Sequence, residues 1–507
     1  MTVTSARITP VSDACGQADP APGADPGRTS EIDTLGIDTL GIDTQEIAAQ
    51  HRDHVLQSWS VSGGPVHTIT RAEGIWLWDE TGRRIADMSS LMVCANLGHG
   101  HPRIAEAIAE QARRFCFMSP AFATEPKSRL AARLVALAGR EHFARVMFTN
   151  GGAESNEHAL RIARTVTGQT KVFSSYRSYH GATAGAAQAT GDWRRLGAEQ
   201  GAGAGFVKFL SPHPYQDGWS GEAADAAATE RALADLERQL RFEGPETVAA
   251  IIVEPVVGAN GVIIPPEGYL PGLRRLCDRY GILLIFDEVM TGFGRTGTMF
   301  AWQGFGRTGT MFAWQGFGVV PDLMTFAKGV DNAAVPLGGV LVSREIARFF
   351  EEHPLPGGLT YSGHTLACAA ANAALDAYEQ YGVLEHVAQT APVLADFLDR
   401  MAREHECVGQ VRHLGMFAAV ELVSDREART PLVGYRSSDT VMKRIIGRLY
   451  DRGFSTFGRE NTLHVSPPLT ITTQELEQVL PILDEVLGWV DREMLPARRA
   501  AAKDMED

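Results

Sequence analysis

The stretch that decides the fold is residues 283–328, which read LLIFDEVMTGFGRTGTMFAWQGFGRTGTMFAWQGFGVVPDLMTFAK. One apolar run, Ile282–Phe286, leads directly into Asp287, and a second, Leu323–Ala327, leads into Lys328. Both runs have the length and composition of buried strands. The sequence therefore predicts two strands whose carboxyl ends carry an acid and a lysine.

Similar runs occur throughout the middle of the chain and alternate with helical patterns. Together with the two above, they are Arg145–Thr149, Lys171–Ser175, Val248–Val253 and Gly339–Val342. Such alternation is typical of a mostly parallel sheet that is covered by helices on both faces. We therefore expect an α/β fold.

The two ends of the chain have a different character. GIWLWDETGRRIADM predicts a hairpin turning at Thr81-Gly82, and an amphipathic helix is expected at Pro102–Arg114. A further strand is expected at Gly415–Leu422. We predict a disordered leader at 1–46, a small domain built from 47–112 and 351–495, a large domain at 113–350 and a tail at 496–507.

Composition limits the possible functions. The 507 residues carry a net charge of −14, which disfavours nucleic acid and anionic membranes as partners. Six scattered cysteines show no metal-ligand spacing and favour reduced thiols. The sequence has no apolar stretch of roughly 20 residues and no secretory signal pattern. We expect a cytoplasmic enzyme that acts on small molecules and uses no metal.

Ligands of parallel sheets bind beyond the carboxyl ends of the strands, so the residues that follow each strand are informative. The turn at 150–155 offers backbone N–H groups for a phosphate, and the aromatics at 176–179 can stack on a flat ring. Asp287 can pair with a protonated nitrogen, and Lys328 can form a Schiff base. Each feature alone has an ordinary structural explanation, but together they predict pyridoxal phosphate as the cofactor.

These segments also resemble a known family. FTNGGAESNEHALRIAR, YRSYHGATAG, IIVEPVVGANGVIIPPEGYL, LLIFDEVMTGFGRTG, PDLMTFAKGV, VPLGGV and GGLTYSGHTLAC occur in the order found in class III, or omega, aminotransferases. The resemblance covers about 51–490 and is greatest to the taurine:pyruvate and β-alanine:pyruvate branch. It implies fold type I, with a seven-stranded, mostly parallel sheet in the large domain and a small α+β domain made from both chain ends.

The resemblance also implies the roles of individual residues. Lys328 would bind the cofactor covalently and move the substrate proton, while Asp287 would pair with the pyridine nitrogen. Tyr179 would stack on the ring. The phosphate would be held by the backbones of Gly152 and Ala153, and by Thr360 of a neighbouring subunit. A homodimer follows from this shared site, and a tetramer is a further option.

For the substrates, the family implies transfer of an amino group from an ω-amino acid or amine to a 2-oxo acid. Ornithine and γ-aminobutyrate enzymes carry a gating glutamate where this chain has Ala259. That difference favours a smaller acceptor, pyruvate. Arg459 is the nearest counterpart of the family's substrate-binding arginine and is predicted to bind a carboxylate or sulfonate, with a solvated loop arginine as the alternative.

The main departure from the family is the exact repeat of GFGRTGTMFAWQ at Gly292–Gln303 and Gly304–Gln315. Lys328 follows Asp287 by 41 positions, and by the usual 29 if one copy is removed. The extra copy could form a surface loop, or it could expose apolar residues such as Met311, Phe312 and Trp314. Because of the repeat, an inactive scaffold stays open as an alternative. A same-fold racemase, aminomutase or decarboxylating transaminase also stays open, because the residues expected around the cofactor do not separate these reactions.

Overall fold

The computed structural model describes residues 43–59, 61–64, 66–199, 203–218, 222–297, 311–437 and 439–496. The chain divides into two units, Met1–Thr68 and Ile69–Asp507. In the first unit, Asp43 caps helix α1 (Thr44–His54) by accepting hydrogen bonds from two backbone N–H groups. The last three residues of the predicted leader are therefore helical, and residues 1–42 lie outside the described residues.

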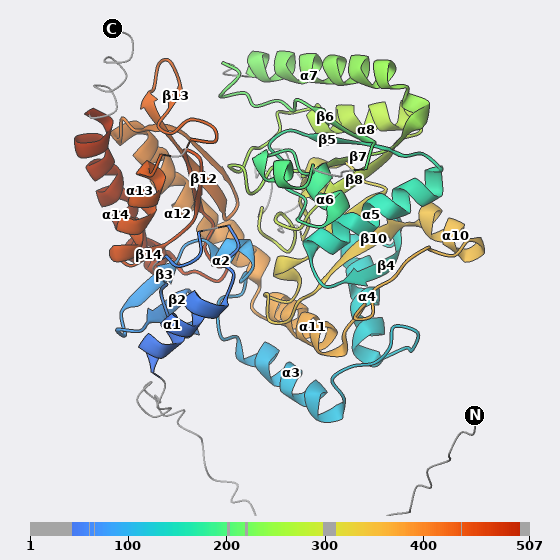
Figure 1. Ribbon diagram of the computed structural model, residues 1–507, viewed down its shortest axis with the longest axis horizontal. Coiled ribbons are helices and arrows are strands. Elements are labelled where there is room, and N and C mark those ends of the chain that lie inside the picture. The colour runs from blue at the N-terminus through green and yellow to red at the C-terminus, as the bar shows by residue number, and fades with distance from the viewer. Residues whose placement is uncertain are drawn as a thin grey trace, which may run out of the picture. The chain divides into compact units, whose positions relative to one another are not determined.

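The second unit contains the predicted mostly parallel sheet of seven strands (Figure 1). Its order is β4 (Phe143–Thr149), β10 (Gly338–Ser343), β9 (Leu323–Phe326), β8 (Leu283–Asp287), β7 (Val248–Val253), β5 (Lys171–Ser175) and β6 (Phe206–Phe209). Strand β10 is antiparallel to both of its neighbours, and the pairings from β9 to β6 are parallel. The sequence analysis missed β6, which has only four residues and follows a glycine-rich segment.

Helices cover both faces of this sheet, as predicted. Strand β7 is buried along its whole length. Ile251 packs in the same cluster as residues of α4 (Glu125–Ala138), α7 (Glu222–Glu243) and α8 (Tyr269–Tyr280). Its neighbour Ile252 packs with residues of α5 (Gly152–Thr167), α6 (Ala184–Ala189) and α10 (Arg344–Glu352). Alternate side chains thus face opposite helical layers, which explains why the strand is apolar throughout.

Two smaller sheets accompany the large one, and the first of them combines segments from both chain ends. In one, β1 (Ile69–Glu73), β2 (Trp76–Asp79) and β3 (Arg84–Asp87) are joined by β14 (Phe454–Ser455), which runs parallel to β3. The other has the order β11 (Val408–Leu414), β12 (Phe417–Asp425), β16 (Thr462–Val465) and β15 (Gly458–Arg459), with β13 (Thr430–Pro431) beside β12. The predicted hairpin and the construction from both ends are confirmed, while the domain boundaries remain predictions.

The remaining helices flank these sheets. They are α2 (Ser90–Val93), α3 (Pro102–Arg114), α9 (Ala313–Phe317), α11 (Thr365–Gln380), α12 (Val383–Glu404), α13 (Val441–Asp451) and α14 (Thr473–Trp489). Helix α3 has the predicted bounds and begins with a proline at its first position, where no N–H is needed. Across the part of the chain that the structure describes, every helix is too short or too polar to cross a membrane.

The repeat folds as one composite copy. Gly292–Gly297 come from the first copy and Met311–Gln315 from the second, and the thirteen residues between them lie outside the described residues. The N–H of Gly294 donates to the carbonyl of Met311 at 3.1 Å. The ring centroids of Phe293 and Phe312 lie 5.3 Å apart. The two halves therefore pack together as parts of a single unit.

The composite copy is buried on both sides of the junction. Met311, Phe312 and Trp314 are 9%, 0% and 6% exposed, so the alternative in which the repeat exposes them is wrong. Arg295 is fully buried and donates to the carbonyl of Pro467 at 2.6 Å and to Asn96 Oδ1 at 2.6 Å. Burial lowers the pKa of Arg295 to about 10. The extra residues are therefore accommodated without removing the unit from the core.

Candidate active site

Asp287 is the last residue of β8 and is buried at the carboxyl end of the sheet. Its Oδ2 atom lies 2.8 Å from Nδ1 of His180 and accepts a hydrogen bond from Nδ2 of Asn156 at 2.7 Å. Its Oδ1 atom accepts the N–H of Val289 at 3.0 Å, with Thr325 Oγ1 at 3.4 Å. These contacts fix the carboxylate, and among the described residues no Lys or Arg side chain pairs with it.

Lys328 begins the turn that follows β9, and its backbone has φ 48°, a left-handed conformation that is costly for a lysine. Its amine makes no hydrogen bond or ion pair with any described residue. Burial lowers the pKa of Lys328, while Cys94, Asp287 and Glu254 act in the opposite direction. An unpaired amine with a lowered pKa is well suited to attack a carbonyl group.

Gly152 and Ala153 form the first turn of α5, where backbone N–H groups have no acceptor within the helix. Gly181 comes so close that an added Cβ there would lie 2.5 Å from Cβ of Ala153. This close approach leaves the helix start next to the YHG segment. The N-terminus of a sixteen-residue helix is a suitable place for a phosphate.

Tyr179 is half-buried, and its backbone N–H donates to Oε1 of Glu254 at 2.9 Å. Burial raises the pKa of Tyr179. The guanidinium of Arg194 lies over the ring, 3.6 Å from its centroid. Burial also raises the pKa of Glu254, to about 7. The predicted stacking residue is thus held in place from its backbone and from one ring face.

Two predicted residues come from outside the large sheet. Thr360 is exposed in the loop that precedes α11, and its contact with a second subunit remains a prediction. Arg459 lies in β15 of the C-terminal sheet and is half-buried. Burial lowers the pKa of Arg459, and the charge of Arg194 lowers it further. The charge of Arg459 acts to lower the pKa of Tyr179, against the larger effect of burial.

These residues fit pyridoxal phosphate. Among the described residues no lysine or arginine pairs with the buried carboxylate of Asp287, so this carboxylate can bind a protonated ring nitrogen. The unpaired amine of Lys328 can react with an aldehyde. The free N–H groups at the start of α5 suit a phosphate. The chemistry of the donors therefore matches the three functional ends of this cofactor.

Sequence reasoning did not identify the partners that orient Asp287, which are Asn156, His180 and Thr325. His180 is part of the YHG motif, so a polar residue directly after the predicted stacking ring was an available signal. Arg194 was also missed, since nothing in its local sequence indicates that it lies over Tyr179.

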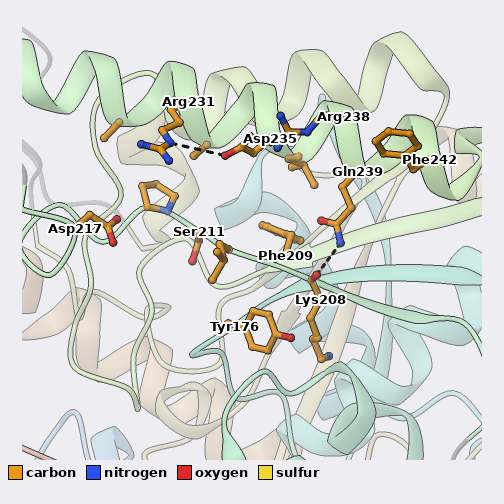
Figure 2. Close-up of a pocket in the computed structure, with 15 residues that line it drawn as sticks. Tyr176, Lys208, Phe209, Ser211, Asp217, Arg231, Asp235, Arg238, Gln239 and Phe242 are labelled. Carbon is orange, nitrogen blue, oxygen red and sulfur yellow. Dashed lines mark hydrogen bonds and ion pairs between the residues drawn. The ribbon is translucent and has the colours of Figure 1, made fainter. Parts of the chain in front are cut away.

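A separate cavity of about 780 Å³ lies between α7 and the segment after β6 (Figure 2). Tyr176, one of the candidate aromatics at 176–179, lines it, but none of the residues to which the family resemblance assigns a role does. The side chain of Lys208 is turned away from α7, and its Nζ donates to Ser174 Oγ at 2.6 Å and to the carbonyl of Ala189 at 2.9 Å. This lysine therefore ties β6 to the end of α6. It is not part of the strand-end cluster, by which we mean Asp287, Lys328 and the residues that contact Asp287.

Comparison with known proteins identifies the family. The sequence model of "Aminotransferase class-III" matches residues 60–303 and 302–487. The boundary between the two matches falls inside the repeat, as expected if one copy is additional to the family pattern. The putrescine–pyruvate aminotransferase of Pseudomonas aeruginosa is 32% identical over 474 residues, which cover 87% of this chain and 96% of the relative.

Solved structures agree. The taurine:2-oxoglutarate aminotransferase of Bifidobacterium kashiwanohense, in complex with PLP and glutamate, has a TM-score of 0.86 and 52% identity, covering 89% of this chain and 99% of that one. An (S)-enantioselective omega-transaminase from Thermomicrobium roseum has a TM-score of 0.81 and 35% identity, with coverage of 89% and 99%. The chain therefore belongs to the class-III aminotransferases, a family of enzymes that use pyridoxal phosphate.

Proposed function

We propose that this enzyme moves an amino group from a taurine- or β-alanine-like ω-amino acid to a 2-oxo acid, with Lys328 as the catalytic amine. The observation that carries the proposal is the unpaired amine of Lys328 at the same sheet edge as the buried carboxylate of Asp287. The 52% identity to a taurine:2-oxoglutarate aminotransferase supports the donor class. The fixed partners of Asp287 support its role opposite a ring nitrogen.

Each residue has a defined task in this proposal. When bound, the cofactor supplies an electron-withdrawing ring that stabilises negative charge on the substrate carbon. Lys328 removes the proton from the amine-bearing carbon and returns it in the second half-reaction. Asp287 keeps the ring nitrogen protonated, and Tyr179 holds the ring plane. Arg459 binds the acid group of the substrate.

The cofactor phosphate is assigned to the N–H groups of Gly152 and Ala153, with Thr360 supplied by the partner of a homodimer. Exposed aromatic residues close to Thr360 support the dimer. Phe117 and Tyr361 are 40% and 56% exposed, and their ring centroids lie 5.6 Å apart. Large apolar side chains at a surface favour burial against another chain. The scattered thiols favour a cytoplasmic location.

Two observations bear on the acceptor. Ala259 packs with Phe417 and Phe457 and offers no carboxylate gate, which keeps pyruvate as a candidate. The neighbour at 52% identity acts on 2-oxoglutarate, which favours that acid. We rank 2-oxoglutarate first and pyruvate second.

The test is a matrix of donors and acceptors with the full-length, cofactor-loaded enzyme. Taurine, β-alanine and an aromatic amine are each combined with 2-oxoglutarate or pyruvate, and the glutamate or alanine formed is quantified. We expect glutamate from taurine or β-alanine. Alanine alone would reverse the ranking of the acceptors. If no pair gives product while the protein is folded, the proposal fails and the inactive scaffold is favoured.

A further inference from the structure

The turn that carries Lys328 is strained at three of its residues. Lys328, Asn332 and Ala333 have φ values of 48°, 60° and 56°. This left-handed backbone is costly for residues other than glycine, although asparagine tolerates it better than most. Such a turn keeps its shape only when contacts from the surrounding structure hold it.

The side chain of Asn332 makes two contacts of this kind. Its Oδ1 atom accepts the backbone N–H of Leu97 at 2.7 Å, and its Nδ2 atom donates to the carbonyl of Gly98 at 2.7 Å. One partner is a donor and the other is an acceptor, and a carboxamide is the side chain that can satisfy both at once. We call this pair of hydrogen bonds the Asn332 clamp.

The segment on the far side of the clamp is fixed in its turn. Leu97 is buried, and Gly98 lies so close to Gly74 that an added Cβ would be 2.8 Å from the carbonyl oxygen of Gly74. His99 and Gly74 exchange two backbone hydrogen bonds, at 2.7 and 3.0 Å. Since Gly74 connects β1 to β2, the clamp anchors the lysine turn to this hairpin.

A second contact joins the same two segments. An added Cβ at Gly329, the residue after Lys328, would clash with Nδ2 of Asn96. Asn96 is buried, and its Nδ2 atom donates to the carbonyl of Phe293 at 3.1 Å, so it has no room to withdraw. The lysine turn is therefore packed against residues 96–98 at both of its ends.

The clamp is connected to the lysine itself through the backbone. The N–H of Ala333, which directly follows Asn332, donates to the carbonyl of Lys328 at 3.2 Å and lies 3.1 Å from Oδ1 of Asp331. This hydrogen bond closes the turn, so a displacement of Asn332 also moves the Lys328 carbonyl. On its other side Lys328 follows β9, which the sheet holds in place. The clamp therefore controls the free end of the lysine turn.

We propose that Asn332 is a positioning residue, whose clamp keeps the amine of Lys328 where it meets the cofactor aldehyde and the substrate carbon. The inference rests on the proposed function of Lys328 and adds a residue that acts through it. Reacting groups must be held closely, because a displacement of about 1 Å can lower a rate by roughly 10²-fold.

The test uses Asn332→Gly, which removes both hydrogen bonds but adds no strain, because glycine adopts a left-handed backbone readily. Cofactor-free protein is mixed with pyridoxal phosphate, and the gain of visible absorbance is followed over time. We expect this rate to fall by about 10-fold, as pre-organisation of the amine is lost. The measurement needs no amino donor and does not depend on turnover.

The loaded enzyme provides a second measurement, in which taurine is added and the loss of cofactor absorbance is recorded. The limiting rate should fall by about 10- to 100-fold in Asn332→Gly. The taurine concentration at half-maximal rate should change by less than about 3-fold, because the clamp is made to backbone groups of this chain and not to the substrate.

The matched control is Asn372→Ala. Asn372 in α11 also makes two side-chain hydrogen bonds to backbone, donating to the carbonyls of Pro126 and Cys368 at 2.9 Å each. Its loss should lower stability against denaturant about as much as Asn332→Gly does, but should leave both rates unchanged. The control therefore separates positioning of the lysine from a general loss of stability.

The inference is overturned if Asn332→Gly keeps both wild-type rates, or if Asn372→Ala slows them by the same factor. It is also overturned if only the half-maximal taurine concentration changes. If the proposed donor class is wrong, wild type reacts with neither taurine nor β-alanine, and the rate with pyridoxal phosphate still decides on Asn332. If wild type gains no absorbance at all, the inference falls with the role of Lys328. Should Asn332→Gly not fold, Asn332→Asp retains the acceptor for Leu97 and should show a smaller fall of the same rates.

Discussion

The strand-end cluster and the repeat are adjacent in the sequence but differ in how sequence relates to structure. In the cluster, Asp287 has one environment, which residues from three other segments create. In the repeat, two identical copies compete for one environment, and Gly292–Gly297 of the first and Met311–Gln315 of the second fill it together. Identical side chains cannot decide which copy packs, so connectivity to the flanking strands decides it.

The two regions meet at Glu288. This residue directly follows Asp287, and its carboxylate accepts the backbone N–H groups of Ala313 and Trp314 at 3.0 and 2.7 Å. The second copy is thereby tied to the end of β8. The comparison predicts that changes in the cluster affect chemistry, whereas changes in the repeat affect stability.

The largest effect is expected for Lys328→Ala. Loss of the only amine proposed to move the substrate proton should lower turnover by roughly 10⁴- to 10⁶-fold. Product formation from taurine is the measurement. The control is Lys443→Ala on the exposed side of α13, which should behave as wild type. The assignment would be contradicted if Lys328→Ala kept a turnover within about 10-fold of wild type. We take this limit as about the largest effect expected for a residue that is not involved in catalysis.

Asp287→Asn should have the next largest effect on rate. The amide keeps the shape but not the charge that holds a protonated ring nitrogen, so kcat/KM should fall by about 10²- to 10³-fold, as when a preorganised electrostatic partner is lost. The melting temperature should change little. A strong loss of stability with a normal rate would instead place Asp287 among purely structural residues.

Arg295→Met and Arg307→Met distinguish the two copies. Arg295 donates to buried acceptors, so its removal should destabilise the fold by about 3–5 kcal/mol. Because Arg295 already occupies this position in the core, the change Arg307→Met should cost less than about 0.5 kcal/mol. Denaturant unfolding measures both. Equal losses would show that both copies contribute to the core.

Glu288→Gln tests the link between the regions. Removing one acceptor from a buried set should cost about 1–3 kcal/mol. Burial raises the pKa of Glu288 to about 7, above its value of 4.5 in a model compound, so the folded state binds the proton more tightly. The advantage of wild type over the variant should therefore be larger at about pH 5 than at about pH 8. If wild type and Glu288→Gln differ in unfolding free energy by the same amount at both pH values, Glu288 does not titrate as a buried acid.

The smallest effect on the reaction is expected when Gly304–Gln315 are deleted. The sequence that remains still spells one complete copy, and a twelve-residue change in loop length costs less than about 1 kcal/mol. The half-reaction with taurine should proceed at the wild-type rate. If only the deletion variant reacts, the extra copy blocks the site in the full-length chain.

Helices and strands whose own residues form a clear apolar or helical pattern were predicted correctly. Strands β5 and β7 have the predicted bounds because every residue of their apolar runs is placed against a helical layer or the sheet. Helix α3 begins at the predicted proline. The four-residue β6 was missed because its edge position requires little apolar sequence, and its signal is weak at that length.

Contacts between distant segments could not be read from the sequence. Asn156 and Thr325 meet Asp287 only because two strands, β8 and β9, and helix α5 converge there. Arg194 reaches Tyr179 through a turn set by Asp192, and no periodic pattern indicates such a contact. The choice between two identical copies of the repeat likewise carries no sequence signal.

The central claim is that Lys328 binds the cofactor in the full-length chain. The most direct test is to load the protein with pyridoxal phosphate, reduce it with borohydride and map the modified peptide by mass spectrometry. Lys208 is the natural comparison, because burial also lowers the pKa of this second lysine, in its case to about 7. We predict a single label on Lys328. A label on Lys208, or none on Lys328, would contradict the account.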